Sequence, residues 1–501
     1  MFLRARLQFL MRSLSAPAIL LGLLAWLTAA PAIAQTDPPP TSPQCTCAEA
    51  PASGSAPSQS LTQTERRQIL SAIEQGEEET EAPLSGVDDG ALVATVLRHA
   101  HTELGQRVRP SQIDPVWAIE PPVRDVVAEF ATAHASGGVG QWLAGLRSSH
   151  AGYRSLSAER CRYLQLVEAG GWPQVGAGRP LKAGDEDPAL LQLRARLIRQ
   201  GYELTATATP ERFDADLSRA LMLFQQRNGL SADGILGPAT RQTLNLTAKA
   251  RLAQIEANLE RWRWLPRDLP ADRIEVDIAA AKATPYAAGT PGLQMRVVVG
   301  DPGHRTPMFA TQVEAVIFNP PWNVPASIAS KELLPKAARD PGYLTRNGFE
   351  RRDGRLVQRP GPSNALGRLK FDFPSPFGVY LHDTPGQAAF ARPVRTLSHG
   401  CIRLEKPREL TEILLASEGW TRFQIDGAIE AGTTRRVAVQ PKKPLYLVYR
   451  TAFIDEEGAL NFLPDVYGWD AKLLSALASA AAAQPTFAPR LDSECSAATH
   501  D

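Results

Sequence analysis

The residues best suited to chemistry lie in one stretch, residues 377–407, which reads FGVYLHDTPGQAAFARPVRTLSHGCIRLEKP. Cys401 follows Gly400 directly, so backbone N–H groups there can approach a substrate without a Cβ atom in the way. A free cysteine has a pKa of about 8.5, so it needs a base to become a good nucleophile at neutral pH. Two histidines could take the proton: His399, two residues earlier, and His382, at the end of the preceding apolar run. Spacing alone does not choose between them.

The alternation of residues before His382 predicts a strand from Gly378 to His382. A period of two places Tyr380 and His382 on one face and Val379 and Leu381 on the other. We therefore expect His382 to point away from the core at a strand end, with Tyr380 beside it as a candidate substrate contact. A second strand is expected to begin just after Cys401.

Three kinds of site fit these residues: a zinc site, a buried structural cysteine and a Cys–His acyl-transfer site. A zinc ion could be held by His382, His399 and Cys401, with Asp383 as a fourth ligand. No paired Cys-x-x-Cys or His-x-x-x-His accompanies them, which weakens the metal alternative. The residues by themselves leave the choice open.

A mainly β domain from about 272 to 455 must position this site. Strands are predicted at Leu293–Val299, Val313–Phe318, Gly378–His382 and Leu445–Val448, with helical segments at Ser327–Arg339 and Pro407–Ser417. Residues 456–501 read as a tail that contains an Ala-rich helix. Loops rich in Pro and Gly separate the strands, as in other mainly β folds.

Helical segments precede the β domain. Residues 61–186 predict a helical scaffold with runs at Glu65–Ile73, Ala91–Leu104, Val123–His134 and Gln141–Leu146. Residues 248–271 predict a connecting helix, and Trp262 and Trp264 near its end are expected to seal a domain junction. Together these patterns predict a multidomain α+β protein.

Residues 187–247 form a separate small unit. Leu217, Ala220, Leu221 and Phe224 follow the spacing of one helix face. Asp214 stands at the N-cap position, and Gly237-Pro238 opens a further short helix. The stretch FDADLSRALMLFQQRNGLSADGILGPATRQTLN resembles the three-helix peptidoglycan-binding module of bacterial wall enzymes.

The beginning of the chain predicts export. Three arginines precede an apolar run from 16 to 30, and Ala32-Ile33-Ala34 supplies a small-x-small cleavage pattern. We expect a signal peptide at 1–34 in preference to a membrane anchor, because the run is short for a bilayer. A Pro- and Ser-rich linker should follow at 35–60. The prediction is a periplasmic protein with no membrane span after cleavage.

Composition limits the classes of molecule that the protein is expected to bind. The net charge is +1 with both signs mixed along the chain, which argues against a nucleic-acid binder. An odd number of cysteines leaves at least one thiol free or paired between chains. The sequence leaves the pairing of the others open: Cys45, Cys47, Cys161 and Cys495.

His382, fifteen further residues and then Ser-His-Gly-Cys is similar to the signature of the L,D-transpeptidases. The flanking stretches VVVGDPGHRTPMF and GPSNALGRLKFDFPSPFGVYLHDTP resemble the large periplasmic members, which carry a helical scaffold and an inserted peptidoglycan-binding module. Many smaller members have Asn where this chain has Arg403. Arg at this position is typical of the large group.

The resemblance implies roles for individual residues. Cys401 is the expected nucleophile and His382 the general base, while His399 shapes the site and orients the thiol. The backbone N–H groups of Gly400 and Cys401 are expected to form an oxyanion hole. Arg403 is a candidate for a substrate carboxylate, with a structural ion pair as the alternative. Residues 321–345, with Trp322, match the family's substrate-covering loop.

The implied activity is acyl transfer on peptidoglycan stem peptides through a thioester, with 3→3 cross-links as product. No metal or other cofactor is expected, and the family also implies acylation by carbapenem-type β-lactams. An L,D-carboxypeptidase or a lipoprotein-anchoring transpeptidase would use the same fold. A non-catalytic peptidoglycan-binding structural protein is the alternative from another class.

Overall fold

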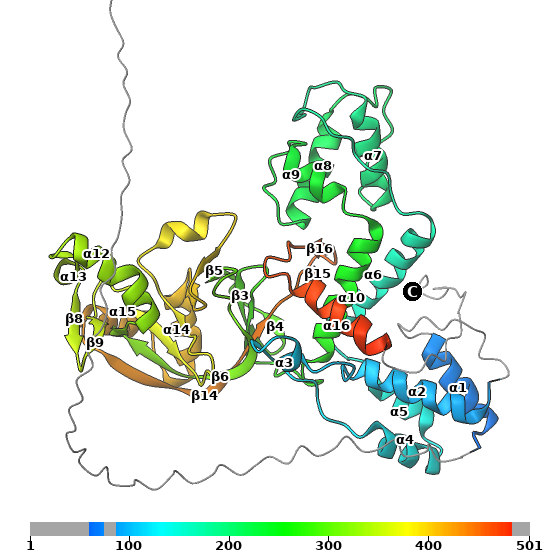
Figure 1. Ribbon diagram of the computed structural model, residues 1–501, viewed down its shortest axis with the longest axis horizontal. Coiled ribbons are helices and arrows are strands. Elements are labelled where there is room, and N and C mark those ends of the chain that lie inside the picture. Colours follow the sequence, from blue (N-terminus) through cyan, green and yellow to red (C-terminus); the bar gives the residue numbers. More distant parts are fainter. Residues whose placement is uncertain (1–59, 75–86, 483–501) are drawn as a thin grey trace, which may run out of the picture. The chain divides into compact units, whose positions relative to one another are not determined.

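The structure is a computed structural model that describes residues 60–74 and 87–482 (Figure 1). The predicted signal peptide, nearly all of the predicted linker, and Cys45, Cys47 and Cys495 lie outside the described residues. Within them, no helix is both long and apolar enough to cross a bilayer. The described cysteines, Cys161 and Cys401, are free thiols.

The centre of the β domain is a sheet that closes on itself. Its strand order is β12-β5-β13-β11-β10-β6-β14-β2-β3-β4, and β3 also pairs with β5, which joins the two sides of the sheet into a barrel. The strands are β2 (Arg273–Asp277), β3 (Lys282–Ala287), β4 (Thr290–Pro291), β5 (Met295–Gly300), β6 (Met308–Phe318), β10 (Leu369–Asp372), β11 (Leu381–His382), β12 (Thr396–Ser398), β13 (Ile402–Leu404) and β14 (Arg435–Val448).

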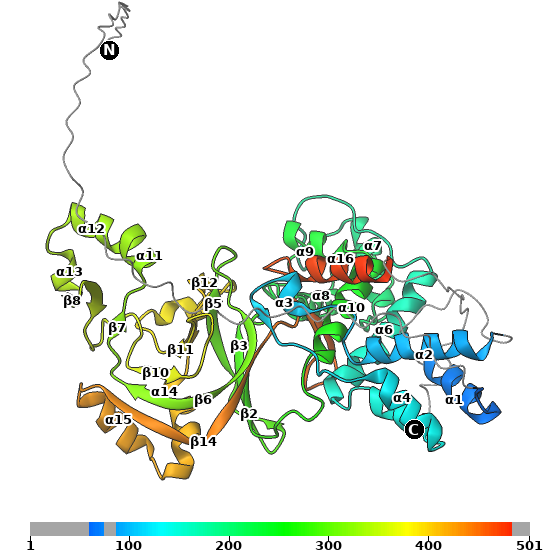
Figure 2. The ribbon, with the colours of Figure 1, turned by 60° about the horizontal axis from the view of Figure 1, so that its bottom comes forward.

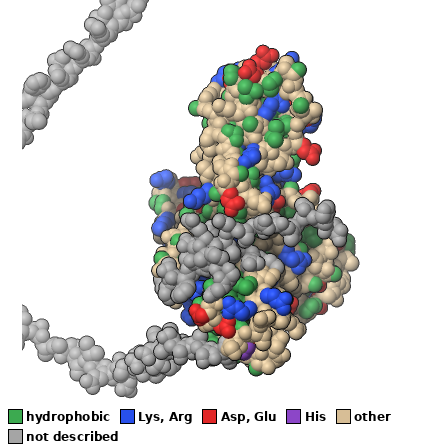
Figure 3. Space-filling view, turned by 90° about the vertical axis from the view of Figure 1, so that its right-hand side faces the viewer, with side chains coloured by type: hydrophobic (Ala, Val, Ile, Leu, Met, Phe, Trp, Pro, Cys, Tyr) green, Lys and Arg blue, Asp and Glu red, His purple; other side chains and the backbone are tan. Residues whose placement is uncertain are grey.

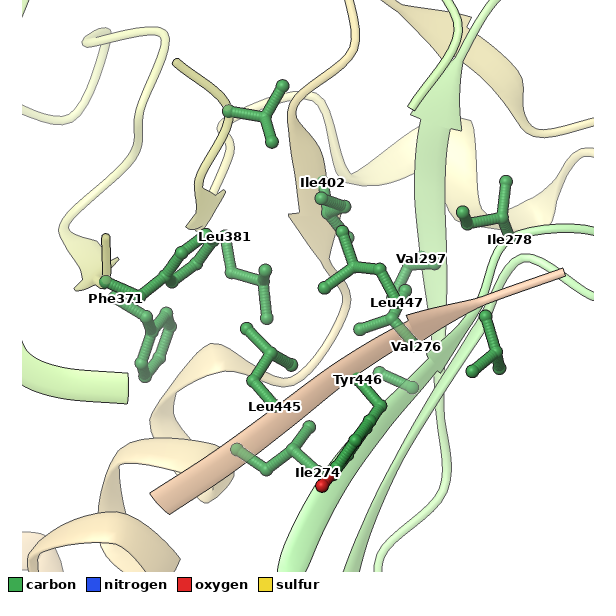
Figure 4. Close-up of a cluster of buried hydrophobic side chains, with 14 of the residues drawn as sticks. Ile274, Val276, Ile278, Val297, Phe371, Leu381, Ile402, Leu445, Tyr446 and Leu447 are labelled. Atoms are coloured by element: carbon green, nitrogen blue, oxygen red, sulfur yellow. The ribbon is translucent and has the colours of Figure 1, made fainter. Parts of the chain in front are cut away.

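The barrel encloses the main hydrophobic core. Alternate residues of neighbouring strands meet inside it, among them Val297, Phe371, Leu381, Ile402 and Leu445 (Figure 4). Each of these side chains is completely buried. Because side chains alternate along a strand, the residues next to Leu381 and Ile402 must face the other side of the sheet.

The strands differ in length from those predicted. The strand predicted from Gly378 is confined to Leu381–His382, since Gly378 adopts a φ of +66° and turns the chain. In contrast, β14 begins at Arg435, well before the predicted Leu445, and it pairs with β6 along most of its length. The predicted helix at 407 is present as α14 (Pro407–Leu415), which packs against β14 and against α15 (Arg422–Glu430) (Figure 2).

The scaffold helices confirm the predicted helical character of the N-terminal part. They are α1 (Gln63–Glu74), α2 (Asp89–Glu103), α3 (Pro110–Ile113), α4 (Val126–Ala135), α5 (Val139–Leu146) and α6 (Ala151–Glu168). Helix α4 begins later than the predicted Val123 because Asp125 caps it, accepting the N–H of Ala128 at 3.0 Å. Helix α6 was not predicted from the sequence, and it packs along the connecting helix α10 (Ala248–Arg263).

The small module has the predicted three helices, α7 (Ala189–Arg199), α8 (Ala215–Arg227) and α9 (Pro238–Leu244). Asp214 accepts the N–H of Leu217 at 2.8 Å, and the four spaced apolar residues of α8 are all buried in the module's core. On the face drawn in Figure 3, which includes this module, basic and acidic side chains are intermixed.

The segment predicted as a tail from residue 456 onward contributes to the fold. Strands β15 (Ala452–Ile454) and β16 (Leu460–Phe462) form a hairpin, and α16 (Trp469–Ala482) follows. Trp469 is buried in the main core, where its ring lies 5.5 Å from Trp117. Trp264, at the end of α10, lies 5.9 Å from Trp117 and is buried in the same core, as expected for a residue that seals a domain junction.

One insertion interrupts the barrel between β6 and β10, and we call residues 319–368 the insert subdomain. It contains β7 (Trp322–Asn323), α11 (Ala326–Ile328), a π-helical turn (Ala329–Leu333), α12 (Leu334–Arg339), α13 (Tyr343–Arg346), β8 (Phe349–Arg352) and β9 (Arg355–Gln358). Strands β7, β9 and β8 form their own sheet, and a separate small hydrophobic cluster lies under the helices. The segment expected at 321–345 is thus part of a longer structural unit.

Candidate active site

The strand register gathers the predicted site residues on one face of the barrel. Strands β11 and β13 are parallel, with Leu381 opposite Ile402 and His382 opposite Arg403. The N–H of Ile402 donates to the carbonyl of Tyr380 at 3.0 Å, which places Cys401 beside Tyr380. Cys401, directly before β13, and His382 on β11 therefore face the same side of the sheet, two register positions apart.

A tight turn presents Cys401. The hydroxyl of Ser398 donates to the carbonyl of Cys401 at 2.6 Å and accepts the N–H of Gly400 at 3.2 Å. Gly400 has a φ of +103°, a conformation that residues with a Cβ rarely adopt. The N–H of Gly400, predicted for an oxyanion hole, is thus engaged by Ser398. Among the described residues, no hydrogen bond occupies the N–H of Cys401.

The thiol of Cys401 is partly buried. Burial raises its pKa above the ordinary value, although hydrogen bonds from the backbone and hydroxyl of Tyr380 and the charges of Arg403 and Lys370 act in the opposite direction. Tyr380 also interacts with Trp322 of the insert subdomain. The structure thus brings both predicted substrate contacts, Tyr380 and Trp322, into the neighbourhood of the thiol.

His382 is 4% exposed and lies on the strand face opposite the core residue Leu381, as predicted. Its Nδ1 lies 2.5 Å from the carbonyl oxygen of Asp383, and a neutral ring that donates this bond leaves Nε2 without its proton. Burial, followed by the charges of Arg403 and Lys370, lowers the pKa of His382 to about 3. At neutral pH this imidazole is uncharged and able to accept a proton.

Asp383 holds the loop that covers His382. Its carboxylate accepts the N–H of Arg368 and the N–H of Thr384, both at 2.7 Å. Gly367 makes this contact possible, because a Cβ there would lie 2.4 Å from the Asp383 carboxyl group. The neighbouring carbonyl of Leu366 contacts the His382 ring. Through these contacts, Asp383 helps to fix the position of the His382 ring.

His399 contacts the insert subdomain and the ring of His304. Its Nε2 pairs with Glu332 of the insert subdomain at 2.8 Å, and its ring lies 4.7 Å from that of His304. His304 is paired in turn with Asp301 at 3.0 Å. About 39% of the His399 side chain is exposed, so this residue connects the Cys401 turn to the insert subdomain.

Lys370 was not recognised from the sequence, and it lies on β10 directly opposite His382. Lys370, His382 and Arg403 thus form one row across three adjacent strands. The ammonium group of Lys370 is 4.5 Å from the centre of the Tyr380 ring and 3.5 Å from Asp372. The alternation in LKFDF predicts a strand, but only the sheet register shows which residue meets His382.

The zinc alternative has no geometric support among the described residues, where no group of three or more His, Cys, Asp or Glu side chains is placed to hold a metal ion. His399 points toward Glu332 and His304, whereas His382 is buried beside Asp383. The arrangement offers a thiol, a neutral imidazole, and two cationic side chains on one face of the sheet. That set is suited to acyl transfer on an anionic substrate.

Comparisons with known proteins identify the domains. Residues 271–436 match the L,D-transpeptidase catalytic domain (YkuD), residues 186–244 a putative peptidoglycan binding domain, and residues 48–159 a scaffold domain. A putative L,D-transpeptidase of Haemophilus influenzae is 33% identical over 254 residues, which cover 47% of this chain and 50% of that protein. The chain thus spans about half the length of this relative.

Other similarities are more limited. An N-acetylmuramoyl-L-alanine amidase of Mycobacterium tuberculosis is 38% identical over 80 residues, covering 14% of this chain and 20% of that protein. Among solved structures, an L,D-transpeptidase from Mycobacterium smegmatis aligns over 36% of this chain and 58% of its own, with 17% identity and a TM-score of 0.22. One from Xylanimonas cellulosilytica aligns over 55% and 99%, with 15% identity and a TM-score of 0.20.

The matched segments agree with the predicted fold class: a helical N-terminal part, a small peptidoglycan-binding module and a mainly β catalytic domain. The signature residues around Cys401 fall inside the matched catalytic domain. The chain therefore contains a segment that matches the L,D-transpeptidase catalytic domain, together with segments that match a scaffold domain and a peptidoglycan-binding domain.

Proposed function

We propose that the protein is an L,D-transpeptidase that joins peptidoglycan stem peptides through 3→3 cross-links. The observation that supports this most directly is the register of β11 and β13, which places Cys401 and a neutral, buried His382 on the same face of the sheet. The proposed site of action is the periplasm, reached through the signal peptide predicted at 1–34.

In the first half-reaction, His382 takes the thiol proton of Cys401 as the sulfur attacks the carbonyl of the L-centre of diaminopimelate in a tetrapeptide stem. The tetrahedral intermediate then expels the terminal D-Ala, whose amine receives the proton from His382. This leaves a thioester between the stem peptide and Cys401. The N–H of Cys401, which makes no hydrogen bond within the described part of the chain, is the proposed donor to the developing oxyanion.

In the second half-reaction, the side-chain amine of another stem's diaminopimelate attacks the thioester. His382 accepts a proton from this amine and returns it to the departing thiolate, so that the amide forms and Cys401 is regenerated. The energy of the broken peptide bond is kept in the thioester. Water in place of the amine would give an L,D-carboxypeptidase, and a lipoprotein lysine would give an anchoring enzyme.

The two cations beside His382 suit the acyl donor. A tetrapeptide stem carries two carboxylates near the scissile bond, one on diaminopimelate and one on the terminal D-Ala. Arg403 and Lys370 stand on either side of His382 and each helps to lower its pKa. A carboxylate that pairs with either cation offsets part of that effect, so that the bound donor makes His382 a stronger base.

This arrangement predicts a preference for donors whose diaminopimelate carboxylate is free. Amidation of that carboxylate should lower kcat/KM for the unmodified protein about tenfold or more, since a charged hydrogen bond is lost. Either Lys370 or Arg403 is expected to bind this carboxylate. When the cation that binds it is replaced by glutamine, amidation should lower kcat/KM by less than about threefold. Initial rates of D-Ala release with the paired free and amidated tetrapeptides measure both ratios.

Lys443→Gln provides the matched control. Lys443 has a similarly buried side chain and a comparable ion pair, 3.3 Å from Asp272, but it lies on β14, which pairs with neither β11 nor β13. This variant should keep the full preference for the free acid. An unchanged preference in both site variants would contradict the assignment of Lys370 and Arg403 to substrate carboxylates.

Mass spectrometry of products from purified disaccharide-tetrapeptides tests the proposed function itself. Release of D-Ala together with a cross-linked dimer supports transpeptidation. Release without a dimer would show hydrolysis, and no reaction would favour a non-catalytic role in binding peptidoglycan. The module at 186–244 supports peptidoglycan as the partner in each case.

A further inference from the structure

A short loop, residues 300–306, forms hydrogen bonds with the turn that carries Cys401. The hydroxyl of Thr306 donates to the carbonyl of Gly400 at 2.8 Å and accepts the N–H of Gly300 at 2.9 Å. The N–H of Asp301 donates to the carbonyl of Ser398 at 2.9 Å. The loop therefore contacts the turn on both sides of His399.

The loop folds back on itself so tightly that only glycine fits at its start. A Cβ at Gly300 would lie 1.9 Å from the carbonyl oxygen of His304 and 2.8 Å from the N–H nitrogen of Thr306. No rearrangement of a flexible side chain could relieve this overlap, because both atoms belong to the backbone. The position of Thr306 relative to Gly400 is thus fixed by the path of the loop.

Two residues outside the matched catalytic domain hold this loop in place. The hydroxyl of Tyr467 donates to the carbonyl of Gly300 at 2.6 Å and accepts the N–H of Thr306 at 3.3 Å. Asp114 of the scaffold domain pairs with Arg305 of the loop at 2.8 Å. Lys472 of α16 reaches the same Asp114 oxygen at 2.9 Å.

The carboxylate of Asp114 forms this ion pair in the interior of the protein. Its side chain is completely buried, and its other oxygen accepts the N–H of Val116 at 3.2 Å. Burial alone would raise the pKa of Asp114, but the hydrogen bonds from Lys472 and Val116 and the charge of Arg305 outweigh burial and lower it. Immediately after this contact, β1 (Trp117–Ala118) pairs with the first residues of β6.

We propose that Asp114 and Tyr467 are positioning residues for the transpeptidase reaction, acting through the 300–306 loop on the backbone of the Cys401 turn. Neither touches the thiol. Their effect passes through Arg305 and Thr306 to the Gly400 carbonyl, the peptide group that carries the N–H of Cys401. If this peptide group rotates, the N–H of Cys401 no longer points toward the proposed position of the oxyanion. The inference rests on the proposed function of Cys401.

The experiment uses single substitutions in the full chain. Tyr467→Phe keeps the ring that stacks on Tyr449 and removes only the hydroxyl. We expect kcat for D-Ala release to fall about five- to tenfold with KM changed less than about twofold, because a misaligned Cys401 N–H weakens its hydrogen bond to the oxyanion, which is made only in the transition state. Asp114→Asn and Thr306→Val should show the same pattern, and Thr306→Ser should restore kcat because it keeps the hydroxyl.

Tyr163→Phe is the matched control for loss of a buried hydroxyl. Tyr163, on α6, is completely buried, and its hydroxyl accepts a hydrogen bond from Gln200 at 3.3 Å, away from the 300–306 loop and from Tyr467. It should lower the unfolding temperature as Tyr467→Phe does, yet leave kcat within about twofold. Equal kcat values for the two variants, measured where both are folded, would overturn the proposal.

A second readout separates this inference from the proposed function. The rate at which iodoacetamide alkylates Cys401, followed by mass spectrometry across pH, requires no peptidoglycan substrate. A shifted profile in Tyr467→Phe and Thr306→Val, with an unshifted one in Tyr163→Phe and Thr306→Ser, supports the positioning role even if no tetrapeptide is turned over. Superimposable profiles in all four variants would contradict it.

Discussion

Substitution of Cys401 by alanine is expected to abolish D-Ala release and cross-linking. Without the sulfur there is no thioester, and the remaining contacts can only bind the donor peptide. The loss should be at least about 10³-fold, the scale seen when a nucleophile is removed from an acyl-transfer site. The change removes one heavy atom from a partly buried position, so the barrel should stay folded. D-Ala release and dimer formation measured by mass spectrometry give the result.

Cys161→Ala is the matched control for this experiment. Cys161 is also a free, partly buried thiol, but it lies on α6, outside the matched catalytic domain and away from β11 and β13. It should keep full activity and should still form a covalent adduct with a carbapenem. Tryptic peptides should carry that adduct on residue 401. Normal turnover by the Cys401→Ala protein would refute the assignment of the nucleophile.

Local patterns predicted the parts of the fold that short-range rules determine. Asp214, the spaced apolar residues of α8 and the Pro238 helix start all occur where helix rules place them. The face shared by Tyr380 and His382 was also correct, because side chains alternate along any strand. The length of that strand was wrong, since the positive φ of Gly378 depends on the turn before it.

The residues that hold the site in position could not be predicted in the same way. Lys370, Asp114 and Tyr467 are far from Cys401 in the sequence, and each reaches the site through sheet register or domain packing. Glu332 meets His399 only because the insert subdomain folds as a unit. Such contacts leave no periodic pattern in the sequence, and a single chain gives no other sign of them.

The oxyanion hole shows why a motif alone is not enough. The resemblance to the family implied that the N–H groups of Gly400 and Cys401 both donate to the oxyanion. In the structure the N–H of Gly400 is bound by Ser398, whose hydroxyl also closes the turn onto the Cys401 carbonyl. The motif therefore specifies a turn whose own hydrogen bonds determine which donor is available to the substrate.

Replacement of His382 by glutamine is expected to have the second largest effect. Glutamine can still donate to the Asp383 carbonyl but cannot take the thiol proton, so kcat should fall about 10²- to 10⁴-fold, the usual contribution of a general base. Because burial and the nearby cations lower the pKa of His382 to about 3, the base stays unprotonated well below pH 6.5. The kcat/KM profile of the unmodified protein should therefore show no loss of this base between pH 7 and about 5. Steady-state rates of D-Ala release across this range check both expectations.

The same depressed pKa makes a separate prediction about stability. An unfolded chain binds a proton at His382 below its ordinary pKa of 6.5, whereas the folded protein does so only near pH 3. Stability due to the neutral ring is therefore fully present above pH 6.5 and is lost as the pH falls toward 3, at up to about 1.4 kcal/mol per pH unit. The His382→Gln protein lacks this dependence, so its stability relative to the unmodified protein should improve on acidification. Urea unfolding of both proteins at pH 7 and pH 4.5 gives the difference in unfolding free energy between them at each pH. Contributions from other titrating groups are common to both proteins and cancel. An unchanged difference would show that His382 titrates normally, and the neutral base assumed in the mechanism would then be protonated in mild acid.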